Sequence, residues 1–252
     1  MFAQEREEEI MSVLRKKKAV TVKELSQKLY VSEATVRRDL SRMERTGALR
    51  RSHGGAVLLE GIKDDPSLLI REQENISGKQ KIADKAIDFI RSSDTLFLDS
   101  SSTAGEVISM LKRYRFLTVI TNGLKNAARL SQETEAEVYM AGGYINSRSR
   151  SALDGDTAAY LEQRFADVAM ISCNGVELNH GITDASPEHS RMKRIMLKNA
   201  RTKILLCTGS KFGLTYMCRT AGFADIDYLI TDQHPGRTIQ KAIEAQGCEL
   251  VF

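Results

Sequence analysis

The 252-residue sequence contains no run of about 18 consecutive apolar residues, which is the length that a membrane-spanning helix needs. Its N-terminus, MFAQEREEEIM, is charged and lacks the apolar core of a secretory signal. The four cysteines, Cys173, Cys207, Cys218 and Cys248, have no paired spacing, and no histidine stands near one at metal-ligand spacing. These absences predict a cytoplasmic protein with reduced, mostly buried cysteines and without a metal site.

The excess positive charge is confined to the first quarter of the chain. Residues 1–57 carry 13 Lys and Arg against 8 Asp and Glu, whereas residues 58–252 carry 24 against 25. A basic module attached to a near-neutral body is typical of proteins that bind a polyanion such as nucleic acid. The sequence therefore predicts a small nucleic-acid-binding domain at residues 1–57 and a larger second domain.

The first 30 residues show the periodicity of two amphipathic helices. The first is expected over residues 4–17, and the second runs from about Val22 to Leu29. Thr21 and Glu24, which are three residues apart, form a capping box that marks the start of the second helix.

A third helix is predicted to begin after Ser32, because serine is a favoured N-cap residue. Val36, Leu40 and Met43 have the spacing of a buried stripe, and Gly47 is suited to end the helix. Hydroxyl and guanidinium groups are left on the other side of this helix: Thr35, Arg37, Arg38, Ser41, Arg42 and Arg45.

Two short helices joined by a turn, the second rich in arginine, describe a helix-turn-helix. In that motif the second helix enters the major groove of DNA, where arginine can bind guanine edges or phosphate. Residues 48–59 predict a β-hairpin wing that turns at a His-Gly-Gly run. Asp39 is expected to orient a neighbouring arginine, because phosphate would repel its carboxylate. The predicted DNA contacts are Ser32, Thr35, Arg37, Arg38, Ser41, Arg42, Arg45, Arg50, Arg51 and His53.

The remaining sequence predicts a linker followed by one α/β domain. Residues 58–74 contain an Asp-Asp-Pro run and are expected to be a linker. Residues 75–252 alternate helical segments with short apolar strands, such as TLFLD and KILLCTG, that end in small or polar residues. This alternation is typical of an α/β domain with a mostly parallel sheet.

Polar residues follow the ends of several predicted strands. Because ligands of parallel sheets bind at the carboxyl ends of the strands, these residues predict a ligand site. Hydroxyls in SSST precede a helix, whose free N–H groups can hold an anion, and a lysine follows a later strand end. The predicted ligand residues are Asp99, Ser100, Ser101, Ser102, Thr103, Thr121, Asn122, Gly143, Asn174, Gly175 and Lys211.

The motifs S-x-x-T-V-R-R-D-L and G-x-L-x-R-x-H-G-G-A, within residues 22–56, resemble the N-terminal signature of the DeoR family of bacterial transcriptional regulators. FLDS, VITN, AGG, ADVAMISCNGVELNHGITD, SKFG and LITD resemble the sensor domain of that family, whose fold is like that of ribose-5-phosphate isomerase. The resemblance implies a repressor of sugar-metabolism genes that binds double-stranded operator DNA and is controlled by a phosphorylated sugar effector. Because one winged module contacts only a few base pairs, we expect a homodimer or homotetramer.

The chain departs from the usual family pattern at two places. It has Ser101-Ser102-Thr103 where the family usually has Gly-Thr-Thr, which keeps hydroxyls but removes a glycine. It has Thr208 where the family usually has an aspartate three residues before the SKFG lysine, which removes a carboxylate that could bind sugar hydroxyls.

A sugar-phosphate isomerase or deaminase of the same fold is the alternative function. An isomerase needs a carboxylate base, for which Asp99, Asp154, Asp184 and Glu188 are candidates, but none lies in a motif that marks a base. An enzyme would also have no use for residues 1–57, so we expect no catalytic residue and no cofactor. An architectural DNA-binding protein with a purely structural body is a third possibility, but it does not explain the polar strand ends.

Overall fold

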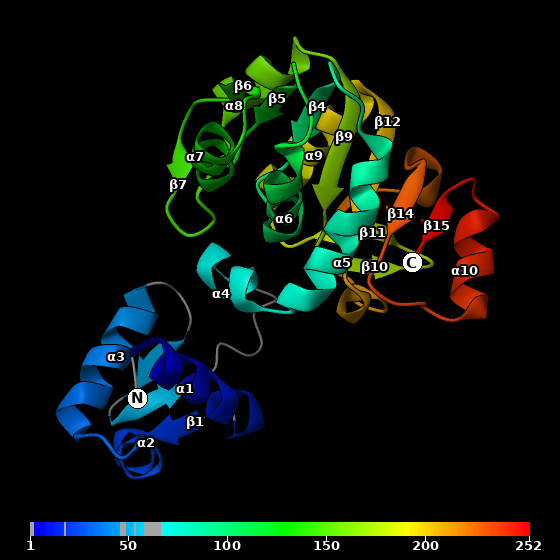
Figure 1. Cartoon of the computed structure of the whole chain (residues 1–252). Helices are drawn as coiled ribbons and strands as arrows, with labels where there is room; N and C mark the ends of the chain where they lie inside the picture. The colour runs from blue at the N-terminus through cyan, green and yellow to red at the C-terminus, as the bar shows by residue number, and fades with distance from the viewer. Residues whose placement is uncertain (1–2, 18, 46–48, 53, 58–66) are drawn as a thin grey trace. The chain divides into compact units, whose positions relative to one another are not determined.

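The computed structural model describes the ranges 3–17, 19–45, 49–52, 54–57 and 67–252. The chain forms two compact units, residues 1–71 and residues 72–252 (Figure 1). Each unit has its own apolar core. Within the described ranges, no helix is long and apolar enough to cross a membrane.

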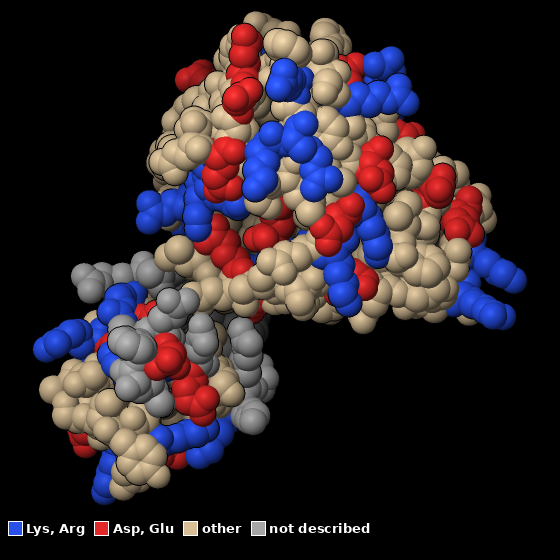
Figure 2. Space-filling view, in the orientation of Figure 1, with Lys and Arg blue, Asp and Glu red and all other residues tan. Residues whose placement is uncertain are grey.

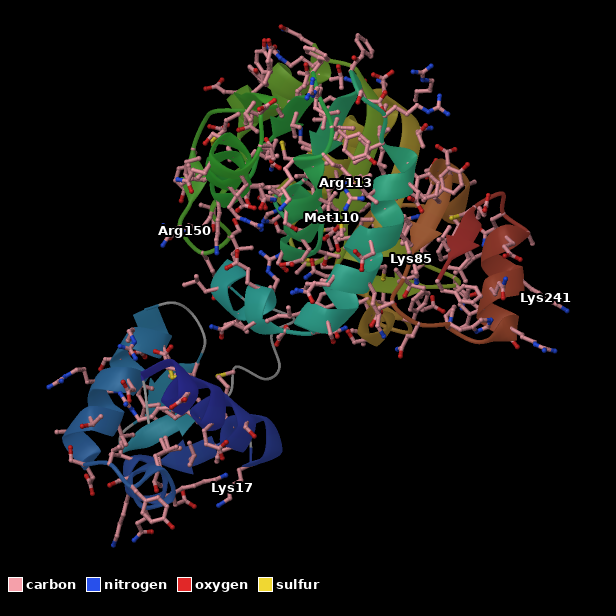
Figure 3. The ribbon with its side chains drawn as sticks, viewed as in Figure 1. Lys17, Lys85, Met110, Arg113, Arg150 and Lys241 are labelled. Carbon is pink, nitrogen blue, oxygen red and sulfur yellow. The ribbon has the colours of Figure 1, made fainter. Side chains whose placement is uncertain are left out.

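The N-terminal unit contains the predicted helices. They are α1 Ala3–Lys17, α2 Val22–Leu29 and α3 Glu33–Arg45. The predicted capping box is confirmed, because the Thr21 hydroxyl accepts from the Glu24 N–H while the Glu24 carboxylate accepts from the Thr21 N–H. Lys17 lies at the end of α1, with its ammonium 3.2 Å from Glu24 Oε1 (Figure 3). The stripe predicted on α3 is buried: Val36, Leu40 and Met43.

A small antiparallel sheet completes this unit. Its strands are β1 Ala19–Thr21, β2 Arg50–Ser52 and β3 Gly55–Val57, in the order β1-β3-β2. The hairpin of β2 and β3 confirms the predicted wing, but β1 was not predicted, because three residues between two helices show no periodicity. Gly55 is needed where β3 pairs with β1, since a Cβ there would lie 2.1 Å from the Val20 carbonyl oxygen.

Part of the segment predicted to be a linker is helical. Helix α4 covers Leu68–Gln73, and Leu68 is buried. Residues 58–66, which include the Asp-Asp-Pro run, lie outside the described ranges, as does Gly47, the residue predicted to end the third helix.

The second unit is built on a seven-stranded sheet in which every strand pair is parallel. The spatial order is β15-β14-β12-β9-β4-β5-β6. The prediction of an α/β domain with a mostly parallel sheet is therefore confirmed. The strands are β4 Thr95–Leu98, β5 Thr118–Thr121, β6 Glu137–Met140, β9 Ala166–Ser172, β12 Ala200–Leu206, β14 Tyr228–Ile230 and β15 Glu249–Val251.

Successive side chains of the central strands face two separate cores. In β9, Val168 and Met170 belong to one core, and Ala169 and Ile171 belong to the other. The first core includes residues of α5 Ile76–Ala86, α6 Ser102–Leu111 and α7 Leu124–Glu133. The second includes residues of α8 Gly155–Glu162, α9 Pro187–Lys198 and α10 Arg237–Glu244. Helices thus cover both faces of the sheet, which leaves its carboxyl edge for a ligand.

Several elements of this unit were not predicted. They are α8, α10, β15, the antiparallel sheet of β10 Gly175–Glu177, β11 Gly181–Asp184 and β13 Cys218–Ala221, and the hairpin of β7 Ile145–Asn146 and β8 Ser151–Ala152. Most of these elements are too short to show a local periodicity, but α10 has Ile239 and Ile243 at helical spacing, a signal that could have marked it. Helix α5 ends at Ala86, and a 3₁₀ turn follows it to Phe89.

Charges of both signs are interspersed on the visible face of residues 72–252 (Figure 2). This agrees with the near-zero charge balance of that part of the sequence. All four cysteines are free thiols, and Cys173, Cys207 and Cys248 are buried.

Candidate functional site

Helix α3 begins where the sequence predicts. The Ser32 hydroxyl accepts a hydrogen bond of 3.2 Å from the Thr35 N–H, and the two hydroxyl oxygens are 3.0 Å apart. Ser32 is therefore the N-cap of α3. Its hydroxyl, which the sequence predicts to contact DNA, is also used to start the helix.

Two arginines lie on the outer side of α3. Arg38 is exposed, and its side chain makes no hydrogen bond or ion pair within the part of the chain that the structure describes. Arg37 is exposed and pairs with Glu33 one turn earlier, at 3.1 Å. Such an exposed pair adds little to stability, so DNA can displace it at small cost. Both guanidinium groups are thus accessible to a partner.

Arg42 is paired within the unit although its side chain is 44% exposed, and its contact with DNA stays a prediction. Its Nε donates to Glu7 Oε1 at 2.6 Å, and one of its terminal nitrogens donates to Asp39 Oδ1 at 3.1 Å. Arg6 donates to both oxygens of the same buried carboxylate, at 2.7 and 3.1 Å. This network holds α1 against α3. The prediction that Asp39 orients a neighbouring arginine is confirmed.

The wing is attached to α3 through Arg51. Its guanidinium donates to Ser41 Oγ at 2.9 Å, and its backbone N–H donates to Glu44 Oε1 at 2.9 Å. Ser41 in turn donates to the Arg37 carbonyl. The Ser41 hydroxyl and the Arg51 guanidinium are thus hydrogen-bonded to each other, and their predicted contacts with DNA stay predictions.

Three predicted DNA contacts cannot be compared with the structure. Arg45 ends α3 and Arg50 begins β2, but their side chains lie outside the described part of the chain, as does the whole of His53. Their contacts with DNA stay predictions.

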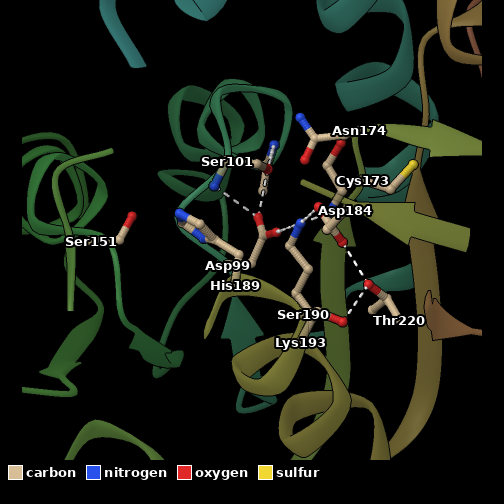
Figure 4. Close-up of polar contacts among 12 residues, drawn as sticks. Asp99, Ser101, Ser151, Cys173, Asn174, Asp184, His189, Ser190, Lys193 and Thr220 are labelled. Atoms are coloured by element: carbon tan, nitrogen blue, oxygen red, sulfur yellow. Dashed lines mark hydrogen bonds and ion pairs between the residues drawn. The ribbon is translucent and has the colours of Figure 1, made fainter. Parts of the chain in front are cut away.

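In the second unit, a buried carboxylate lies at the centre of the carboxyl edge of the sheet. Asp99 Oδ1 accepts from the N–H of Ser101 at 3.0 Å and from its hydroxyl at 2.5 Å. Asp99 Oδ2 accepts from the Ser172 N–H at 3.0 Å and lies 3.8 Å from the ammonium of Lys193 (Figure 4). Asp99 therefore joins the ends of β4 and β9 to the N-terminus of α6.

Lys193 is a buried cation between two buried carboxylates. Its Nζ donates to Asp184 Oδ1 at 2.5 Å, while Asp184 Oδ2 accepts from the Thr220 hydroxyl at 2.7 Å (Figure 4). Burial lowers the pKa of Lys193, but Asp184 and Asp99 together outweigh burial, so its pKa lies above the ordinary value. The lysine is therefore charged at neutral pH, and it neutralises part of the negative charge at this edge.

Lys211 lies at the same edge and is less buried. Its Nζ donates to the Cys173 carbonyl oxygen at 2.6 Å and to Ser172 Oγ at 3.1 Å. An ammonium has three donors, so one is left for a ligand. Because Ser172 also donates its N–H to Asp99, one chain of hydrogen bonds runs from Lys211 through Ser172 and Asp99 to Ser101.

The hydroxyls at the start of α6 are buried and have different roles. Ser101 is the N-cap, and its Oγ accepts from the Ala104 N–H at 3.1 Å. Ser102 and Thr103 are the first two residues of the helix, and Ser100 packs against Gly123 of the next strand end. The local structure of this run is thus the helix N-terminus that the sequence predicts.

The end of β5 contributes a buried acceptor without a partner. Asn122 Nδ2 donates to the Ala152 carbonyl at 3.0 Å, whereas its Oδ1 is buried and accepts no hydrogen bond within the described residues. Thr121 Oγ1 accepts from the Gly123 N–H. Asn126, which the sequence did not mark, donates to the carbonyl oxygens of Asp99 and Ser101 and so connects α7 to the strand ends.

The other three predicted ligand residues have structural partners. Gly143 has a φ of +137°, and a Cβ there would lie 2.2 Å from Asp154 Oδ1, at the N-terminus of α8 rather than beside Asp99. Asn174 Oδ1 accepts from the Ala185 N–H at 3.4 Å. Gly175 begins β10, and its carbonyl accepts from the Thr183 hydroxyl.

Both parts of the chain match models of one protein family. Residues 6–61 match the DeoR-like helix-turn-helix domain, and residues 74–233 match the DeoR C terminal sensor domain. The chain belongs to the DeoR family. The regulator GolR of Listeria innocua is 33% identical over 248 residues, which cover 98% of this chain and 97% of that protein.

Further relatives of this DeoR-family protein are also named as transcriptional regulators. FruR of Bacillus subtilis is 32% identical and covers 92% of each chain, and the repressor GlcR of the same species is 32% identical over all of this chain and 96% of that protein. Among solved structures, a ribose-5-phosphate isomerase in complex with phospho-erythronic acid is 18% identical, with a TM-score of 0.40, over 56% of this chain and 55% of that chain.

The structure explains part of what is unusual in this DeoR-family sensor domain. Ser101, which stands where the family usually has glycine, caps α6 and donates to Asp99, so its hydroxyl is used within the fold. Thr208 is buried, and its hydroxyl oxygen lies 3.2 Å from that of Ser210. No carboxylate stands at that position, so sugar hydroxyls would need other partners there.

Lys193, which forms the most buried ion pairs of this edge, is not among the predicted ligand residues. The residue lies in the middle of α9, where lysine ordinarily belongs to a solvated face. The local signal that could have marked it is its spacing, because Met196 and Leu197, three and four residues on, share its side of the helix and are buried.

Proposed function

We propose that this DeoR-family regulator is a repressor of sugar-metabolism genes that binds operator DNA through α3 and the wing. Helix α3 presents Arg37 and Arg38 outward, while Arg42 and Arg51 hold α1 and the wing against it. The names of its relatives support this role, since GlcR is called a transcriptional repressor and a similar Escherichia coli protein is called a putative aga operon repressor.

The proposed effector is a phosphorylated sugar bound at the carboxyl edge of the sheet. The observation that carries this proposal is the hydrogen-bond chain from Lys211 through Ser172 and Asp99 to Ser101. It places an ammonium with a spare donor and the N-terminus of α6 on one edge, and both attract an anion. Asn122 Oδ1 adds a buried acceptor without a partner, which suits a sugar hydroxyl.

Regulation rather than catalysis is the role that the carboxylates support. Asp99 and Asp184 each accept hydrogen bonds at both oxygens and lie beside Lys193. Asp154 caps α8, and Glu188 accepts from the Ser186 hydroxyl. Each carboxylate that could have served as an isomerase base is therefore engaged in the fold, and we propose that the protein is not an enzyme.

We also propose that the protein acts as a homodimer or homotetramer. One winged module contacts only a few base pairs, so useful specificity needs two modules placed on repeated half-sites. Sedimentation of the purified full chain, with and without operator DNA, measures the assembly directly.

The effector proposal is tested by a thermal-shift screen of the full chain against phosphorylated sugars and their unphosphorylated counterparts. We expect one phosphorylated compound to stabilise the protein and to release it from DNA, while the parent sugar does neither. Turnover of that compound would contradict the regulator proposal and support the isomerase alternative.

A lysine variant locates the effector. For Lys211→Ala we expect DNA binding to persist and release by the effector to be lost. Lys198→Ala removes an exposed lysine from the end of α9 and should leave both properties unchanged. If Lys211→Ala responds to the effector like the parent protein, the site is not at this edge.

A further inference from the structure

Tyr30 occupies the turn between α2 and α3 and is 93% exposed. It is the C-cap residue of α2 and has a φ of 54° and a ψ of 40°, a left-handed conformation that favours glycine. A tyrosine here neither buries its ring nor relieves the strain of the backbone. Folding of this unit therefore does not account for the residue.

The backbone of the turn is held without the tyrosine side chain. The Ser26 carbonyl accepts from the N–H groups of Tyr30 and Val31, and the Ser26 hydroxyl donates to the Val31 carbonyl at 2.6 Å. The ring can thus be replaced while the geometry of the turn is kept, and whatever the ring contributes lies outside the fold.

Its position indicates what it contacts. Tyr30 precedes Ser32, the N-cap of α3, by two residues, and the N-terminal end of a recognition helix is the part that meets base edges. The turn before it therefore lies beside the phosphates that border the groove. Tyrosine hydroxyls are among the groups that bind DNA phosphate oxygens.

We propose that the Tyr30 hydroxyl donates a hydrogen bond to a backbone phosphate beside the groove that α3 enters. This inference rests on the proposed function and adds a contact to it. The contact is independent of base sequence, so it sets the position and depth of α3 rather than its choice of bases.

Phe116 provides a matched comparison in the second unit. It is also an exposed aromatic residue in the left-handed region, with a φ of 60° and 79% exposure. It lacks a hydroxyl and lies before β5, away from any helix-turn-helix element in the sequence. Exposure and strain alone therefore do not assign a DNA contact; the position before α3 and the phenol do.

The test uses the full chain with the variants Tyr30→Phe, Tyr30→Gly and Phe116→Gly. Affinity is measured on a duplex selected from a random pool and on unselected random duplexes, over a range of salt concentrations. We expect Tyr30→Phe to bind both kinds of DNA about tenfold more weakly. The slope of affinity against salt should stay the same, because a neutral phenol displaces no counterion.

The glycine variants separate DNA contact from folding. Tyr30→Gly should bind at least as weakly as Tyr30→Phe while melting at a higher temperature, because glycine relieves the left-handed strain. Phe116→Gly should also gain stability but bind DNA like the parent protein.

Tyr30→Phe binding like the parent would overturn the proposal, even if Tyr30→Gly alone lost affinity, since the ring rather than the hydroxyl would then make the contact. A loss confined to the selected duplex would also overturn it, because that result assigns a base contact. Failure of the parent to bind DNA would overturn the proposed function as well. If Tyr30→Phe binds DNA with the parent affinity while Arg38→Ala binds more weakly, only the tyrosine contact is overturned and the proposed function stands.

Discussion

The two units place their candidate functional side chains in opposite environments. In the N-terminal unit, Arg37 and Arg38 are exposed and come from one short helix. In the second unit, Asp99, Asp184 and Lys193 are buried and come from a strand end, a second strand and a helix. A macromolecule is bound by groups on the surface, whereas a small ligand is bound by groups that the fold has already taken from water.

In the N-terminal unit, the residues that bind are therefore different from those that stabilise the fold. In the second unit, the same residues do both. Removal of an exposed arginine changes DNA affinity with little effect on folding. Removal of a member of the buried cluster leaves an uncompensated charge, so folding and ligand binding are lost together.

The largest effect is expected for Lys193→Met. Two carboxylates would lose the buried ammonium between them, which should lower the free energy of unfolding of the second unit by about 3–5 kcal/mol. Denaturant unfolding monitored by hydrogen exchange in β4 and β9 measures it. Lys198→Met, on the exposed side of the same helix, should change stability by less than about 0.5 kcal/mol. Equal effects of the two variants would break the contrast between buried and exposed charges.

The second-largest effect is expected for Asp39→Asn, in the N-terminal unit. The amide of this variant would have one uncharged oxygen acceptor in place of the two charged oxygens that accept from Arg6 and Arg42. We therefore expect a loss of roughly 2–3 kcal/mol of stability in that unit. Hydrogen exchange of the α3 amides reports it. Glu33→Gln breaks only the exposed pair with Arg37 and should have little effect. A normal Asp39→Asn would show that the network does not hold α1 and α3 together.

Arg38→Ala should weaken DNA binding by about 1–3 kcal/mol without lowering the melting temperature. A base contact would relax preference at one operator position, whereas a phosphate contact would weaken all duplexes and reduce the salt dependence. Arg113→Ala removes the same charge from the surface of the second unit (Figure 3) and is the control. Equal losses in the two variants would assign the effect to net charge.

The smallest effect concerns pH. Hydrogen bonds from the Thr21 N–H and hydroxyl, and then Lys17, lower the pKa of Glu24 from 4.5 to about 2. Because the folded-state pKa is lowered, the capping contribution is present above pH 4.5 and is lost as the pH falls towards 2. The stability difference between the parent and Glu24→Gln should therefore disappear over that interval. A difference that persists below it would contradict a role for the ionised carboxylate.

The sequence predicted the N-terminal unit better than the second one. The limits of α2, the start of α3, its buried stripe and the wing all depend on residues within a few positions of one another, such as Thr21 with Glu24. The ion pairing of Arg42 was not predicted, because its partner Glu7 lies 35 residues away on another helix. Strand β1 was missed because its pairing with β3 involves residues 34 to 38 positions apart.

For the ligand site, the sequence predicted which strand ends carry polar groups but not which of them meet. Asp99, Ser101 and Lys211 are joined through Ser172, which was not marked, whereas Gly143 belongs with Asp154. That arrangement depends on the strand order β12-β9-β4, in which neighbours are distant in the chain.

The amino-acid sequence by itself determined the local elements, the family and the separation of a basic module from a near-neutral body, because caps, periodicity and motifs act over a few residues. Only the tertiary structure decided which arginines and which carboxylates are paired within the fold. Those properties depend on burial and on partners brought together by packing, and a charged group is free or neutralised according to neighbours that the chain supplies from far away.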